Sequence, residues 1–189
     1  PELKLNLNEL ESLKKDFALP IKPIDLEGFK DKVDFNYGIW KKNNVRSHKV
    51  SGHSIVNISL TKLGTAPGDA TSEQMRILAK LADEFSSGEI RTTKRQTIVF
   101  PFVRKDQVFD LWKSLEQYDL SSPHQGTLAQ IVACPGRDYC DLAKAVSIPI
   151  ATRVQERFND MNRLLDIGDL KINISGCENS CAHHHIADI

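Results

Sequence analysis

Apolar residues follow helix-like and strand-like spacings most clearly in the middle of this 189-residue chain. Residues 54–60 are rich in β-branched side chains and alternate apolar with polar positions, which is typical of a half-buried strand. Thr71 and Gln74 have the spacing of a capping box and predict the start of a helix, which Gly88 is expected to end. Apolar residues of this helix recur at three- and four-residue steps and form one face: Met75, Leu78, Ala79, Ala82 and Phe85.

Two more strands and a second helix are expected after this helix. Residues 89–91 and 96–103 have strand-like composition, and Pro101 predicts that the second strand lies at an edge or ends there, because proline cannot donate a ladder hydrogen bond. Asp106 is expected to cap a helix whose apolar face is Val108, Leu111, Trp112 and Leu115. This order of elements predicts an α+β fold, with a ferredoxin-like half-domain over residues 48–122.

The pattern before residue 48 is weaker. Five leucines could line one face of a short helix: Leu3, Leu5, Leu7, Leu10 and Leu13. Pro20 and Pro23 interrupt any regular element after that helix, and residues 29–40 mix aromatic with charged side chains, as a linker on the surface does. We interpret residues 1–47 as an N-terminal arm or linker.

A second unit is expected over residues 123–189. Residues 128–133 and 170–174 are short apolar segments that predict strands. Between them, residues 140–164 have helical spacing, and Pro149 should kink or break that helix. Strand, helix and strand in this order predict the start of an α/β domain.

The two ends of the chain indicate a fragment. The chain begins at Pro1 without a methionine, and residues 185–189 have the apolar alternation of a strand that has just begun. A strand at that position would have no partner for its edge. We therefore expect further sequence in the parent protein.

Composition excludes some classes of function. The chain has 25 basic and 25 acidic residues and a formal charge of zero, which argues against nucleic acid or an anionic membrane as the main partner. No apolar run approaches the roughly 20 residues of a membrane span, and no signal-peptide pattern opens the chain. We expect a cytoplasmic protein.

All four cysteines lie in the last third, as two pairs: Cys134 with Cys140, and Cys177 with Cys181. The cytoplasm disfavours disulfides, and structural zinc sites usually have shorter spacings than the five residues between the first two cysteines. An iron–sulfur cluster accepts wider spacings and fits better. The remaining alternative is four unrelated buried thiols.

The predicted backbone around both pairs favours an anionic group. Each pair comes directly after a predicted strand, at a turn that is expected to lead into a helix whose free N–H groups attract negative charge. Gly136 and Gly176 permit a close approach of the main chain. If residues 178–184 are helical, Cys177 and Cys181 lie one turn apart on one face.

These motifs together resemble the C-terminal half of siroheme-dependent nitrite and sulfite reductases. The C-x5-C pair at 134–140, the S-G-C-x-N-S-C motif at 175–181 and the A-D-I sequence at 187–189 are the most specific features. The strand–turn segment 88–96 is similar to a further motif of that family. The resemblance covers residues 50–189.

The resemblance implies a 4Fe-4S cluster and a siroheme. Its cluster ligands would be Cys134, Cys140, Cys177 and Cys181, and Cys181 would also be the axial ligand of the siroheme iron. Arg91, Arg95 and Gln96 match positions that hold siroheme carboxylates, a task for which guanidinium and amide donors are suited. Asn179 could hydrogen-bond near the cluster or the macrocycle, or cap a helix.

The resemblance also implies an activity and partners. The parent enzyme would reduce nitrite to ammonia or sulfite to sulfide with six electrons from ferredoxin or a flavoprotein. Family members bind the anionic substrate largely through their N-terminal half, so no catalytic residue is expected in this half. We expect the N-terminal half as a partner and an inactive isolated fragment.

Two other classes of function remain open. One is a 4Fe-4S electron-transfer module without siroheme, which a visible spectrum would distinguish. The other is a structural zinc domain or a metal-free interaction domain, which metal analysis would identify. The consecutive His183, His184 and His185 are not interpreted as a metal triad, because three adjacent side chains point in different directions.

Overall fold

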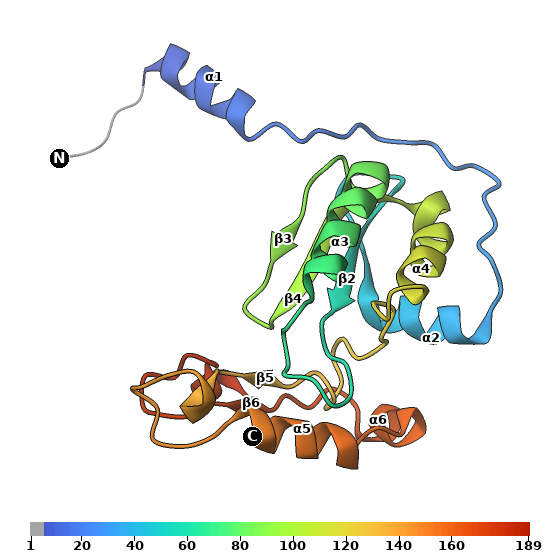
Figure 1. The fold of residues 1–189 in the computed structure, drawn as a ribbon. Helices are drawn as coiled ribbons and strands as arrows, with labels where there is room; N and C mark the ends of the chain where they lie inside the picture. The colour runs from blue at the N-terminus through green and yellow to red at the C-terminus, as the bar shows by residue number, and fades with distance from the viewer. Residues whose placement is uncertain (1–5) are drawn as a thin grey trace.

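A four-stranded antiparallel sheet is the centre of the larger unit. The computed structural model describes residues 6–189, and Figure 1 shows the sheet behind two helices. The strands β1 (Val45–Ser47), β2 (His53–Ser59), β3 (Arg91–Thr92) and β4 (Thr97–Arg104) have the spatial order β1-β2-β4-β3. The expected strand at residues 54–60 is therefore confirmed as β2.

Helices α3 (Ser72–Phe85) and α4 (Val108–Glu116) pack together and supply apolar faces to the core beside the sheet. The capping box is confirmed, because the Thr71 hydroxyl accepts from Gln74 N–H and the Gln74 side chain accepts from Thr71 N–H. Asp106 is not the cap of α4. It lies in a short 3₁₀ turn, and its carboxylate accepts two hydrogen bonds from the Arg104 guanidinium instead.

Pro101 does not place its strand at an edge. β4 lies between β2 and β3, so the prediction from Pro101 was wrong. The reason is a register shift opposite Ile55 of β2, while the short β3 pairs only with Ile98 and Val99. Neither neighbouring strand pairs with Pro101, so its missing N–H breaks no ladder.

Residues 35–44 are part of the core and not a surface linker. Helix α2 (Phe35–Asn44) begins at Asp34, whose carboxylate accepts from Tyr37 N–H at 2.8 Å. Tyr37 and Trp40 are each only 1% exposed and belong to the same apolar cluster as α3 and α4. Burial, with the nearby Asp31 carboxylate, raises the pKa of Tyr37.

Helix α1 (Leu7–Asp16) has no buried residue and is joined to α2 by an extended segment. Its apolar face matches the expected spacing, and Leu7, Leu10 and Leu13 are on it with large exposed areas. Leu3 and Leu5 lie outside the described residues.

The second unit is smaller and is built on two short parallel strands, β5 (Val132–Ala133) and β6 (Asn173–Ile174). Helices α5 (Ile148–Arg157) and α6 (Met161–Ile167) contribute apolar side chains to its core. Figure 1 shows this unit below the four-stranded sheet. Both units mix helices with strands, so the α+β class is confirmed.

The helical pattern at residues 140–164 is only partly helix. Residues 140–147 form turns, and α5 begins at Ile148 with Pro149 in its first turn. The expected break is therefore confirmed and there is no kink, because a proline in the first helical turn breaks no hydrogen bond and has a suitable φ.

The C-terminal residues do not form a regular strand. His184–Ile186 is a 3₁₀ turn, yet Asp188 and Ile189 donate their N–H groups to the carbonyl of Lys171. Their backbone thus lies beside the segment that leads into β6. Among residues 6–189, no helix is both long enough and apolar enough to cross a membrane.

Trp40→Ala should destabilise the protein by about 3–5 kcal/mol, because it removes a large buried side chain from the core of the sheet unit. Phe35→Ala in the same helix should change stability by less than about 0.5 kcal/mol, because Phe35 is 81% exposed. Urea unfolding of both variants measures the difference. Equal effects would show that α2 is not packed as described.

Candidate metal centre

The parallel pairing of β5 with β6 brings both cysteine segments to one edge. Ala133 is in register with Ile174, and Cys134 N–H donates to the Ile174 carbonyl at 3.1 Å. Both strands run in the same direction, so the residues after each one leave at the same end. Cys134 comes directly after β5, and Cys177 comes three residues after Ile174.

The two cysteine turns contact each other through glycine. A Cβ on Gly176 would lie 3.1 Å from Gly136 Cα and 2.7 Å from the carbonyl oxygen of Ala145. Lys144 and Ala145 also donate their N–H groups to the Gly176 carbonyl, at 2.8 and 3.0 Å. Because no side chain separates them, the backbones of the two turns pack directly together.

Cys134 is the one buried thiol of the four, and its sulfur makes hydrogen-bond contacts. The sulfur accepts from Gly176 N–H at 3.1 Å. The Ser147 hydroxyl lies 3.4 Å from this sulfur and 2.8 Å from the Cys134 carbonyl oxygen, and its single hydrogen can be donated to either. Burial raises the pKa of the thiol, but hydrogen bonds from Ser147 and from the N–H groups of Gly176 and Gly136 outweigh it and hold the pKa below its ordinary value. These hydrogen bonds stabilise a thiolate.

The other three cysteines are more accessible. Cys140 and Cys177 are half-buried, Cys181 is exposed, and all four are free thiols. The backbones of the two cysteine turns are thus in contact, whereas three of the four thiol side chains are accessible to solvent. Among the residues described, however, no three His, Cys, Asp or Glu side chains lie within reach of one metal ion.

The expected helix at residues 178–184 is absent. This segment forms turns, with Ser180 and His183 in left-handed conformation at φ +55° and +56°. The Cys177 and Cys181 side chains are therefore not held on one helical face. His184 Nδ1 lies 3.0 Å from the Ser180 hydroxyl within this turn.

The expected siroheme contacts have different environments. Arg91 is exposed and donates to Glu89 at 2.6 Å, and its guanidinium lies over the Phe102 ring. Asn179 is exposed in the second cysteine turn. Arg95 and Gln96 are half-buried, and their side chains contact the segment that leads into Cys134.

An apolar cavity of about 650 Å³ opens beside the second cysteine turn. Half of its lining residues are aliphatic and come from α5, the β6 segment and the C-terminal residue: Ile150, Val154, Ile172, Ile174 and Ile189. Cys177 and four polar residues form the rest: Asn173, Ser175, Glu178 and His184. A cavity of this size and character suits a mostly apolar ligand. Sequence reasoning did not identify it, because its wall comes from three separate segments.

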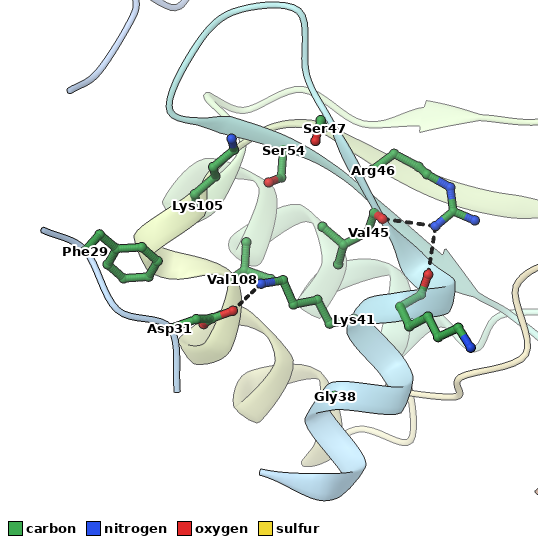
Figure 2. Close-up of a pocket in the computed structure, with 11 residues that line it drawn as sticks. Phe29, Asp31, Gly38, Lys41, Val45, Arg46, Ser47, Ser54, Lys105 and Val108 are labelled. Atoms are coloured by element: carbon green, nitrogen blue, oxygen red, sulfur yellow. Dashed lines mark hydrogen bonds and ion pairs between the residues drawn. The ribbon is translucent and has the colours of Figure 1, made fainter. Parts of the chain in front are cut away.

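A second cavity, of about 620 Å³, lies between α2, β1 and the start of α4 (Figure 2). Its wall includes Lys41, Lys42, Arg46 and Lys105. Much of this charge is already engaged, because Lys41 pairs with Asp31 and the Arg46 guanidinium donates to two backbone carbonyls. The cavity shares no lining residue with the cavity beside Cys177, and the candidate site therefore remains at the cysteines.

Comparison with known proteins identifies the class. The family model described as the nitrite/sulfite reductase ferredoxin-like half domain matches residues 61–118, which include α3, β3, β4 and α4. Residues 61–118 are therefore a ferredoxin-like half domain of the nitrite and sulfite reductase type.

Particular relatives extend this result. The chain is 30% identical over 136 residues to sulfite reductase (ferredoxin) 2 of Mycolicibacterium paratuberculosis, covering 69% of this chain and 24% of the relative. It is 30% identical over 134 residues to the chloroplastic ferredoxin–nitrite reductase of Spinacia oleracea, covering 70% of this chain and 22% of the relative. The chain thus spans about a quarter of the length of these relatives.

A solved structure has the same fold. The NirA protein of Mycobacterium tuberculosis aligns with a TM-score of 0.60 over 95% of this chain and 31% of that protein. The sequences are 24% identical, so this similarity concerns the fold alone. It includes both units described above, because nearly the whole chain is aligned.

Gly136→Ala should destabilise the protein more than Gly168→Ala, although both residues have positive φ. A Cβ on Gly168 meets nothing within 4 Å, so only backbone strain of about 1–3 kcal/mol is expected at its φ of 78° and ψ of −156°. A Cβ on Gly136 would lie 2.2 Å from Ser147 Oγ and add about 1–3 kcal/mol for overpacking. Urea unfolding tests this, and equal losses would contradict the close packing of the cysteine turns.

Proposed function

We propose that Cys134, Cys140, Cys177 and Cys181 hold a 4Fe-4S cluster in a siroheme-dependent nitrite or sulfite reductase. The observation behind this proposal is the contact between the two cysteine turns at one end of the β5–β6 pair. The match of residues 61–118 to the ferredoxin-like half domain of nitrite and sulfite reductases supports it independently.

The donor set fits such a cluster. Four free thiols and no other ligand type are the usual donors to iron–sulfur clusters, and N–H groups around Cys134 favour negative charge there. No three of these sulfurs lie within reach of a single metal ion. A cubane cluster does not need such a group, because each of its four thiolates binds a different iron. We expect the accessible cysteine side chains to become ordered when the cluster binds, as in other proteins whose metal sites form on binding.

Siroheme, when bound, would supply an iron at which nitrite is reduced to ammonia or sulfite to sulfide. We propose that Cys181 is a ligand shared by the two iron centres, which its exposure permits. Arg91, Arg95 and Asn179 would donate hydrogen bonds to the macrocycle or its carboxylates. Gln96 has one amide hydrogen left for this purpose, because its other donor and its oxygen are already bonded to Ala133.

The wider function is also a proposal, since this chain spans only about a quarter of its relatives. Two relatives are named for ferredoxin, so ferredoxin is the proposed electron donor, with a flavoprotein as the alternative. The substrate-binding cations and the rest of the siroheme site would come from the N-terminal half. The chain by itself would then be inactive, and we expect the enzyme in the cytoplasm.

Anaerobic reconstitution of the chain with iron and sulfide should incorporate about four of each per chain, the composition of one cubane cluster. Replacing any one of the cysteines with serine should lower both numbers sharply. Glu178→Gln is the matched control, because Glu178 lies between two proposed ligands but pairs only with the exposed Lys144. Iron and acid-labile sulfide assays give the result.

Three outcomes separate the classes of function. A stable cluster whose content depends on all four cysteines supports the proposal. Tight retention of zinc in place of iron would instead establish a structural zinc domain. A cluster in the chain, with no siroheme in the whole enzyme, would establish an electron-transfer module.

In the full-length enzyme, Cys181→Ser should remove both the cluster and the siroheme, because the residue is the proposed ligand of both. Arg91→Ala should only reduce siroheme content, since one charge-assisted hydrogen bond contributes about 1.5–3 kcal/mol. Arg76→Ala, an exposed arginine on α3, is the control and should retain both groups. A normal siroheme absorption spectrum in the Cys181 variant would refute the shared ligand.

A further inference from the structure

The side chain of Gln96 pairs with the backbone of Ala133 in the way that a neighbouring strand would. Its Nε2 donates to the Ala133 carbonyl at 2.7 Å, and its Oε1 accepts from Ala133 N–H at 3.0 Å. Gln96 belongs to the turn between β3 and β4, whereas Ala133 is the last residue of β5. We call this pair of hydrogen bonds the Gln96 latch.

The latch satisfies the open edge of β5. In a parallel pair, alternate residues direct their backbone groups toward the partner strand. Val132 N–H and Cys134 N–H donate to the carbonyls of Ile172 and Ile174, so Ala133 faces away from β6. Ala133 is only 3% exposed, and its N–H and carbonyl would lack a partner without Gln96.

The local backbone is adapted to this contact. Gln96 has φ +55°, a left-handed conformation that is uncommon for a residue other than glycine, asparagine or aspartate. Gly68 provides the space, because a Cβ there would lie 2.8 Å from Gln96 Cβ. The strained conformation directs the amide of Gln96 toward β5, where it makes both hydrogen bonds.

A second pair of contacts runs parallel to the latch. The Arg95 guanidinium donates to the Gln130 carbonyl at 3.3 Å, and the Gln130 amide donates to the Arg95 carbonyl at 3.5 Å. Gln130 is only 1% exposed. The turn between β3 and β4 is therefore bonded to the segment before Cys134 at two successive points.

We infer that Gln96 is a positioning residue that fixes Cys134 for cluster binding, in addition to any contact with a macrocycle. Ala133 directly precedes Cys134, so the latch ties the first cysteine to the sheet unit, whose core forms without the second unit's residues. The inference that Gln96 positions Cys134 for a cluster rests on the proposed function. The two hydrogen bonds of the latch are observed in the structure and do not depend on it.

Gln96→Leu and Gln96→Gly test the latch in the metal-free chain. Leucine keeps the size of the side chain without its hydrogen bonds, and glycine removes the latch while relieving the positive φ. Both variants should raise the hydrogen-exchange rate of the Ala133 amide at least tenfold, with little change at the Leu111 amide in the core. Gln117→Leu, at an exposed position after α4, should change neither rate.

The same variants test the consequence for the cluster after anaerobic reconstitution. The rate of iron loss to a chelator should rise at least threefold in both Gln96 variants and stay unchanged in Gln117→Leu. An unchanged Ala133 exchange rate would refute the latch whatever the metal content. Faster Ala133 exchange with an unchanged rate of iron loss would refute the positioning role. If the unaltered chain assembles no cluster, the positioning role fails with the proposed function, while the exchange rates still decide the latch.

Discussion

The pairing of β5 with β6 is the constraint on which the candidate site depends. These strands have only two residues each, yet their parallel register places both cysteine turns at one end of the pair. Gly136 and Gly176 then allow the turns to touch without intervening side chains. Two sequence segments about forty positions apart are thereby combined into one possible ligand set, which neither segment could provide alone.

The unit that contains the four-stranded sheet, the sheet unit, supports the β5–β6 pair through direct hydrogen bonds. Its core is continuous from α2 through the sheet to α3 and α4, and does not include any cysteine. The second unit has a smaller apolar cluster and short strands, so its geometry depends more on specific hydrogen bonds. The contacts of Gln96 and Arg95 supply such bonds, and they join the two units close to Cys134.

Local chemistry decided which features could be predicted from the sequence. The helix after Thr71 was predicted well because its capping box and apolar periodicity lie within the helix itself. The inner position of the strand that contains Pro101 could not be predicted. A proline is accepted there only because the register between β2 and β4 shifts opposite it, and this shift cannot be read from the sequence. The cysteine pairs were recognisable by spacing. The hydrogen bonds of Gln96 could not be predicted from the sequence, because its partner Ala133 is 37 positions away.

We propose that the four cysteines of the two turns bind one cluster. X-ray absorption at the iron edge of the anaerobically reconstituted chain tests this directly, since it reports the atoms around each iron. A cubane cluster held by the four thiolates should give sulfur-only ligation with strong iron–iron scattering. Nitrogen or oxygen ligands at full iron loading, or iron without iron neighbours, would contradict it.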